Sequence, residues 1–257
     1  MSSGRRGGVA HGYFEESRRP LHILAFILPL LLLYEAGSAR YLSGDSGGGG
    51  LTETIRAISI LVGFFQDFGA VGRFLPAVAL VTVLVVWHLF TGERWRLRPL
   101  VIPAMALESV GWTIPLIVLV ALIHATGSTA APALASGAGG LMDLSWQARA
   151  TISIGAGLYE ELLFRMVGIA AVHLVLVDVA RVSNRVGSAV AVLVTAAAFA
   201  AYHDVTGPGG EVRVLEASQL VCAGAYFGVL YLQRGFGVVV GVHALYDIFV
   251  LVIRPTL

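Results

Sequence analysis

The sequence predicts an all-α fold, a polytopic integral membrane helical bundle of about seven to eight transmembrane helices. The chain of 257 residues is 57% hydrophobic, and only 13% of its residues are charged. Its mean hydropathy is +0.82, far above that of a soluble domain. Apolar runs that approach or exceed the roughly 20 residues needed to cross a bilayer recur along the chain. Together these observations indicate a protein that is embedded in a membrane.

The order of polar and apolar segments predicts the organisation of the chain. Residues 1–19, rich in Gly, Ser and Arg, are expected to form a disordered cytoplasmic N-terminus. Residues 20–146 are expected to hold the N-terminal transmembrane helices, with an amphipathic interfacial helix near 51–68 that counts as an eighth span if it crosses. The spans are predicted at about residues 21–42, 70–91, 98–125, 147–176, 187–204, 215–232 and 236–253.

Arginines set the expected orientation. In a seven-span arrangement the arginine clusters fall on one side, which the positive-inside rule identifies as cytoplasmic. The N-terminus is then inside the cell and the C-terminus outside. A net charge of +1 gives no basic field for nucleic acid, so the expected partner is the lipid bilayer. These clusters are Arg5, Arg6, Arg18 and Arg19, then Arg94, Arg96 and Arg98, then Arg181 and Arg185, and finally Arg234.

Two adjacent carboxylates interrupt an apolar run at Glu160 and Glu161, with Arg165 shortly after them. Charges within a span are costly and are by default a hypothesis for a functional site. Glu161 and Arg165 are four residues apart and share a helical face, which predicts a structural ion pair. Glu160 is rotated by about 100° and stays available for chemistry. The alternative is a packing ion pair with a spare glutamate.

Two later spans carry further pairs of residues with the same spacing. Phe199 and His203 are four residues apart near the end of one span, and His243 and Asp247 lie inside the last. Three helices are therefore expected to converge on one polar site. A glutamate in this setting can take a proton from water beside a neutral histidine, and a second histidine can donate hydrogen bonds to an oxyanion. The set suits peptide hydrolysis without a covalent nucleophile.

A metal-dependent reaction is the rival chemistry. Glu160, His203 and His243 are residue types that bind zinc, and zinc would itself activate a bound water. The sequence has no His-Glu-x-x-His motif. General-base catalysis with no required cofactor is therefore the favoured prediction. The single cysteine, Cys222, lies in an apolar stretch and is a poor candidate for a nucleophile.

The three motifs resemble those of the CaaX prenyl protease and bacteriocin-processing family of intramembrane proteases, called CPBP or Abi. The resemblance covers about residues 147–253, and it implies that residues 147–257 form a catalytic transmembrane core. It further implies that Glu160 activates water with His203, that Glu161 pairs with Arg165, and that His243 with residue 247 forms the oxyanion site. The motifs are Glu160-Glu161-x-x-x-Arg165, Phe199-x-x-x-His203 and His243-x-x-x-Asp247.

One position departs from the family pattern. Residue 247, often asparagine in the family, is aspartate here. An ionised carboxylate cannot donate a hydrogen bond, so Asp247 must be protonated, orient His243 or bind something else. Two other acids lie within predicted spans, and each either lines the cavity or pairs with Arg40 or another helix. These acids are Glu35 and Glu108.

The predicted function is that of a glutamic-type intramembrane endopeptidase in a bacterial inner membrane. Its substrate would be a membrane-anchored protein or peptide, such as a sorting tail, a prenylated tail or a bacteriocin precursor. One alternative is a non-catalytic protein of self-immunity or scaffolding, against which the intact Glu160, His203 and His243 argue. Another is a proton-coupled transporter, which the lack of an evident internal repeat disfavours. The position of His203 predicts a cavity that opens towards the outer face.

Overall fold

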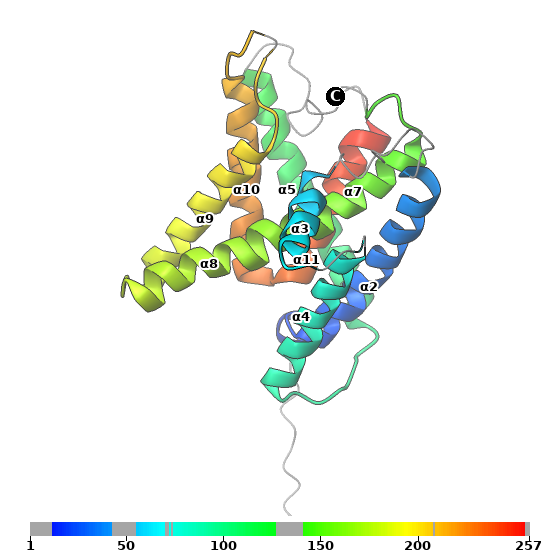
Figure 1. The fold of residues 1–257 in the computed structure, drawn as a ribbon, viewed down its shortest axis with the longest axis vertical. Coiled ribbons are helices and arrows are strands. Elements are labelled where there is room, and N and C mark those ends of the chain that lie inside the picture. Colours follow the sequence, from blue (N-terminus) through cyan, green and yellow to red (C-terminus); the bar gives the residue numbers. More distant parts are fainter. Residues whose placement is uncertain are drawn as a thin grey trace, which may run out of the picture.

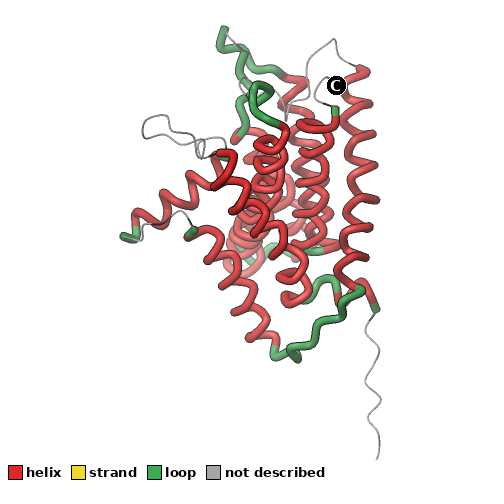
Figure 2. Tube along the Cα trace, turned by 90° about the vertical axis from the view of Figure 1, so that its right-hand side faces the viewer, coloured by secondary structure: helices red, strands yellow, loops and turns green. Residues whose placement is uncertain are grey.

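The computed structural model describes residues 12–42, 55–69, 72, 74–126, 141–207 and 209–254. These residues form helices joined by loops, with a single isolated bridge between Thr206 and Val212 and no longer strand among them. Figure 2 shows the helices running between the two ends of the bundle. The predicted all-α architecture is confirmed. Residues 1–11, which are predicted to be disordered, and residues 51–54 of the predicted interfacial segment lie outside the described residues.

Six helical segments of the described chain are long and apolar enough to cross a membrane. The helix α4 (Leu75–Thr91) is apolar but shorter, and it corresponds to the span predicted at residues 70–91. The predicted multi-pass membrane bundle is thereby confirmed. The six segments are α2 with η1 (Pro20–Gly37, Ser38–Leu42), α5 (Val101–Thr126), α7 with η3, α8 and η4 (Trp146–Glu161, Leu162–Ile169, Ala170–His173, Leu174–Val179), α9 (Asn184–Tyr202), α10 (Val214–Arg234) and α11 with η5 (Phe236–Ile248, Phe249–Ile253).

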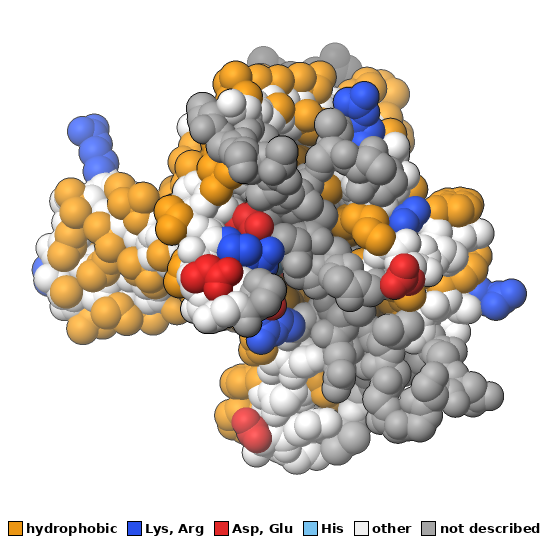
Figure 3. Space-filling view, turned by 90° about the horizontal axis from the view of Figure 1, so that it is seen from above, with side chains coloured by type: hydrophobic (Ala, Val, Ile, Leu, Met, Phe, Trp, Pro, Cys, Tyr) orange, Lys and Arg blue, Asp and Glu red, His pale blue; other side chains and the backbone are white. Residues whose placement is uncertain are grey.

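The helix α11 is the centre of the bundle. It packs against α7, α5, α10 and α2, and nearly all of its residues are buried, whereas many side chains of the outer helices are exposed and apolar. The helices α9 and α10 form a second packed pair beside it (Figure 1). Seen from above, hydrophobic side chains cover the flanks, and acidic and basic side chains gather near the middle of the face (Figure 3). The buried polar residues of the site lie between α7, α9 and α11.

The two ends of the described chain, near residues 12 and 254, lie at opposite ends of the bundle. In Figure 1, α2 starts at its lower end and α11 runs towards the upper end, where the C-terminus is marked. An odd number of passes through the membrane requires this arrangement, as in the predicted seven-span model. The cytoplasmic placement of the N-terminus stays a prediction.

Residues 12–19 differ from the predicted disorder. They form the short helix α1 (Tyr13–Glu16) and a following turn. Glu16 is buried because it pairs with Arg19 at 3.2 Å and with Arg98 at 3.5 Å. Arg98 lies far from Glu16 in the sequence, so local composition could not reveal the order. The N-terminal segment is thus tied to the loop before α5.

Glu108 of α5 has a structural partner. Its carboxylate pairs with Arg234 of α10 and accepts hydrogen bonds from the hydroxyl of Tyr13 at 2.5 Å and from Trp112 Nε1 at 3.1 Å. Burial and the hydrogen bond to Glu108 raise the pKa of Tyr13. Of the two predicted roles for Glu108, the structure shows the pairing with another helix. Glu35 contacts the hydroxyl of Tyr159 at 3.3 Å, beside a cavity under α3.

The helix α3 (Arg56–Asp67) occupies the predicted amphipathic segment. It buries Ala57 and Ile58 towards the bundle and exposes Phe64 and Phe68 on its other side. Such a helix suits the boundary between lipid headgroups and acyl chains. Its interfacial position stays a prediction, but its start reaches the polar site described below.

A glycine allows α7 and α11 to approach closely. A Cβ at Gly157 would lie 2.9 Å from the backbone nitrogen of Ala244 and 2.9 Å from the carbonyl oxygen of Val240. Backbone atoms cannot move aside as the end of a flexible side chain can. The absence of a side chain at Gly157 therefore sets the spacing between the helix that carries Glu160 and the helix that carries His243.

We expect Gly157→Ala to destabilise the protein by about 1–3 kcal/mol, because added volume in a tight interface forces backbone shifts. Unfolding by denaturant in detergent measures the change. The matched control is Gly111→Ala in α5, where a Cβ would meet nothing within 4 Å. This control should be neutral or slightly stabilising, since alanine is a better helix former than glycine. Equal effects of the two substitutions on the free energy of unfolding would contradict the prediction that the close approach of α7 and α11 at Gly157 excludes a side chain.

Candidate active site

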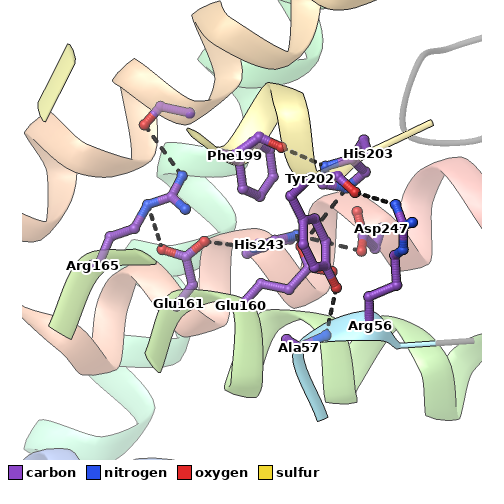
Figure 4. A network of polar contacts seen from close by, with 11 residues as sticks. Arg56, Ala57, Glu160, Glu161, Arg165, Phe199, Tyr202, His203, His243 and Asp247 are labelled. Atoms are coloured by element: carbon purple, nitrogen blue, oxygen red, sulfur yellow. Dashed lines mark hydrogen bonds and ion pairs between the residues drawn. The ribbon is translucent and has the colours of Figure 1, made fainter. Parts of the chain in front are cut away.

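The two adjacent glutamates lie where the helical geometry changes. Glu160 and Glu161 end α7, and the next residues, Leu162–Ile169, form the π-helical segment η3. Wider π turns are frequent at functional sites, because they redirect side chains that a regular helix would place elsewhere. Both carboxylates are buried. The polar network around them is drawn in Figure 4.

Glu161 forms the predicted ion pair with Arg165. Glu161 Oε2 lies 3.1 Å from Arg165 Nε, and both side chains are fully buried. The Nη2 atom of Arg165 donates to the carbonyl oxygen of Gly224 at 3.2 Å. The guanidinium also lies over the rings of Phe199 at 4.7 Å and Phe227 at 5.2 Å. A buried charge of this kind needs such partners, because its desolvation is costly.

Glu161 has a second partner, His243. Its Oε1 accepts a hydrogen bond from His243 Nδ1 at 2.7 Å. The imidazole is stacked on Phe227, with ring centres 4.6 Å apart and an angle of 15° between the planes. Because a carboxylate can only accept, the proton on Nδ1 is assigned and Nε2 faces the site. The sequence did not reveal this contact between helices.

Glu160 faces both histidines. Its Oε2 lies 3.9 Å from His203 Nε2 and 3.9 Å from His243 Nε2. This buried oxygen has no hydrogen-bond partner within the part of the chain that the structure describes. Distances of 3.9 Å are too long for direct hydrogen bonds and suit an atom placed between the groups. The arrangement can hold a water molecule against a carboxylate.

His203 directly follows α9 and lies at the open side of the cluster. Its Nδ1 lies 2.8 Å from the carbonyl oxygen of Phe199, and the side chain is 18% exposed. Since a carbonyl oxygen only accepts, Nδ1 carries the proton, and in the neutral ring Nε2 is an acceptor. Phe199 thus fixes the tautomer through its backbone and contacts the imidazole with its ring at 4.6 Å.

The loop after His203 is held by its own hydrogen bonds. Asp204 Oδ1 accepts from the backbone nitrogen of Thr206 at 3.1 Å and from its hydroxyl at 2.6 Å. These hydrogen bonds lower the pKa of the exposed Asp204. Arg213 donates to the carbonyl oxygen of Asp204 at 2.9 Å and so closes the loop. Asp204 therefore supports the position of His203 and does not point into the site.

Asp247 lies one helical turn beyond His243. Its Oδ2 is 3.5 Å from His243 Nε2, and its buried Oδ1 has no hydrogen-bond partner among the described residues. Among the roles open to an aspartate at this position, the geometry favours orientation of His243. Carboxylates then lie near both nitrogens of the imidazole, with Glu161 at Nδ1.

The zinc alternative finds no ready set of ligands among the described residues. In the described chain, no three His, Cys, Asp or Glu side chains are grouped so that they could hold a metal ion. No catalytic step is therefore derived through a metal.

Three residues of the site were not predicted. Tyr202 donates a hydrogen bond to Glu160, and it is held by Arg56 and Ala57 at the start of α3. Tyr202 lies within the Phe199-x-x-x-His203 motif, and this position was the feature of the sequence that could have indicated its role. No feature of the sequence indicated that α3 contributes to the site. The hydrophobic periodicity of a helix does not show which residues of another helix it contacts.

The fold and the site define a class, namely polytopic helical membrane proteins with a buried cluster of glutamate and histidine at the meeting point of three helices. Residues 143–249 match the model of the family described as type II CAAX prenyl endopeptidase Rce1-like. This part of the chain is similar to an Rce1-like domain, and the predicted resemblance to the CPBP family is confirmed. No curated protein and no solved structure matches the chain.

The matched segment contains all three predicted motifs and the helices α7, α9, α10 and α11. At the level of the family, the match supports a membrane-embedded protease that acts on a protein substrate. The helices α1 to α5 lie outside it, although α3 contributes contacts to the site.

Proposed function

We propose that the protein is an intramembrane endopeptidase that cleaves a membrane-anchored protein or peptide with water activated by Glu160. One observation carries the assignment. Glu160 Oε2 is buried, has no hydrogen-bond partner in the described chain, and lies at equal distances of 3.9 Å from His203 and His243. A carboxylate oxygen held in this way is suited to accept a proton from a water placed beside it.

The attacking water would lie between Glu160 Oε2 and His203 Nε2. Both atoms accept hydrogen bonds when the imidazole is neutral, so they bind the two hydrogens of the water and leave an oxygen lone pair for the substrate. Glu160 takes one proton as the water oxygen bonds to the carbonyl carbon of the peptide. Orientation of the reacting groups in this way supplies a large part of the rate enhancement by an enzyme.

His243 would stabilise the oxyanion of the tetrahedral intermediate through a proton on Nε2. The carboxylates of Glu161 and Asp247 face the two ring nitrogens, and each can accept a hydrogen bond from a protonated nitrogen. A preformed donor of this type acts where negative charge develops. Asp247 then serves His243 and does not itself donate, which accounts for an aspartate at this position.

The reaction balances without a cofactor. When the intermediate collapses, the carbon–nitrogen bond breaks and the proton on Glu160 passes to the leaving amine. Glu160 is then ionised again, and the second product is a carboxylic acid that ionises in water. We propose that no metal is required, that the protein resides in a bacterial inner membrane, and that its N-terminus is cytoplasmic.

The test is cleavage of a library of membrane-anchored peptides by the protein reconstituted in vesicles, in water enriched with oxygen-18. Mass spectrometry should find one heavy oxygen in the new carboxyl group of each cleaved peptide. A chelator should leave the rate unchanged, because the proposed reaction uses no metal. Loss of cleavage with the chelator and recovery with zinc would contradict this mechanism.

The same reconstituted vesicles separate the protease from the two alternative functions. A wild-type protein that cleaves no peptide of a broad library would favour a non-catalytic role in immunity or scaffolding. Proton flux across the vesicle membrane that depends on Glu160 and on a co-transported solute would favour a transporter. Cleavage without such flux supports the proposed protease.

A further inference from the structure

We infer that Tyr202 is a positioning residue that decides which oxygen of Glu160 acts as the base, and that α3 belongs to the active site because it orients Tyr202. This inference rests on the proposed function. Tyr202 is the last residue of α9 and lies between α3 and the end of α7. Its hydroxyl contacts one partner on each side (Figure 4).

The hydroxyl of Tyr202 has one proton to donate. On one side it accepts a hydrogen bond from the backbone nitrogen of Ala57 at 2.6 Å. The hydroxyl proton therefore points away from Ala57, towards Glu160 Oε1 at 3.2 Å. Ala57 lies in the first turn of α3, where backbone N–H groups have no partner within the helix. The hydrogen bond from Ala57 thus gives an otherwise unpaired N–H group of α3 a partner. It also sets the direction in which the hydroxyl of Tyr202 donates.

The position of the hydroxyl is fixed by the helix α9, to which Tyr202 belongs, and by neighbours from two other segments, η3 and α3. The ring of Tyr202 packs edge-on against Phe164 of η3, with centres 5.3 Å apart. Arg56 Nη1 donates to the carbonyl oxygen of Tyr202 at 2.6 Å and holds the end of α9. The side chain is therefore constrained from α3, α9 and η3 together.

The consequence for Glu160 follows from its two oxygens. Tyr202 binds Oε1, which leaves Oε2 to face His203 and His243. The terminal torsion of a glutamate side chain is broad, so an unanchored carboxylate can turn away from the two histidines. Without the hydrogen bond, only a fraction of the molecules would present an oxygen to the water. The effect falls on the chemical step and not on substrate binding.

We expect Tyr202→Phe to lower kcat by about 10- to 100-fold, because small misplacements of a reacting group have effects of this size. KM should stay within about twofold, since uniform binding is not affected. Arg56→Met, at the exposed start of α3, should lower kcat by a smaller factor, because it removes the support of Tyr202 and leaves the hydroxyl in place.

The matched control is Tyr226→Phe. The hydroxyl of Tyr226 donates to the carbonyl oxygen of Trp112 at 2.5 Å, outside the catalytic cluster. Each variant is assayed for kcat and KM with a peptide that the wild type cleaves, and its thermal unfolding in detergent is recorded. Tyr226→Phe should retain the wild-type kcat, and both tyrosine variants should unfold at similar temperatures.

Three results would overturn the inference: a Tyr202→Phe variant with the wild-type kcat, a loss confined to KM, or equal losses of kcat in Tyr202→Phe and Tyr226→Phe that follow lower unfolding temperatures. The proposed function fails in a different way, namely when the wild type cleaves no peptide. The two failures are therefore distinguishable in one set of assays.

Discussion

Glu160→Gln is expected to reduce kcat by about 10³-fold or more, because the proposed base is lost and general acid–base groups contribute about 10²- to 10⁴-fold. Glutamine has nearly the same shape as glutamate and can still accept the hydrogen bond from Tyr202, so the variant should fold. Cleavage of a membrane-anchored peptide by reconstituted protein, followed by mass spectrometry, measures the effect.

The control for this substitution is Glu15→Gln. Glu15 lies in α1 and pairs with Arg19 at 3.7 Å near the surface, so its loss should leave cleavage unchanged. A Glu160→Gln variant that is folded and retains more than about a tenth of the wild-type rate would remove Glu160 from the role of base. The peptide bond would then have to be attacked by a water held elsewhere.

Arg165→Met is expected to destabilise the protein by about 3–5 kcal/mol, because it leaves the buried Glu161 without its ion pair. Both side chains are fully buried, so water cannot take the place of the guanidinium. Cleavage should also fall, because Glu161 binds and orients His243. Denaturant unfolding in detergent measures the stability, and the peptide assay measures the activity.

A double variant tests the electrostatic cause. Glu161→Gln combined with Arg165→Met removes both charges and keeps an amide oxygen that His243 can bond. Most of the lost stability should return, since a neutral pair is less costly to bury than a single charge. The control is Arg40→Met at an exposed position, with an expected change within about 0.5 kcal/mol. Failure of the double variant to recover stability would point to lost packing of the arginine and not to charge.

The fold class was predictable because a membrane imposes a strong condition on the sequence. Backbone groups in lipid must be paired within each helix, so long apolar runs indicate spans without knowledge of their packing. This logic predicts the long helices α2, α5, α7 and α9 to α11 from composition alone. It also suggests seven passes, although α4 is shorter than the other spans. The order in residues 12–19 was missed, because it depends on Arg98 and Arg234, which are distant in sequence.

The candidate site was predictable in part. The pairs Glu161–Arg165 and His243–Asp247 are four residues apart, and contacts at this spacing follow from the turn of one helix. The order of the three motifs and the family they resemble also came from the sequence. The residue types alone leave zinc open as an alternative, and only the structure shows that the described residues hold no ready group of three metal-binding side chains.

The sequence by itself determined the membrane-embedded helices, the residue types available for chemistry and the ion pairs within single helices. Only the tertiary structure decided how the helices are rotated and how deeply each is placed, and hence that Glu161 binds His243 and Tyr202 binds Glu160. The physical reason is that helical periodicity fixes neighbours within about one turn. Contacts between helices depend instead on close packing, such as the approach of α7 to α11 at Gly157.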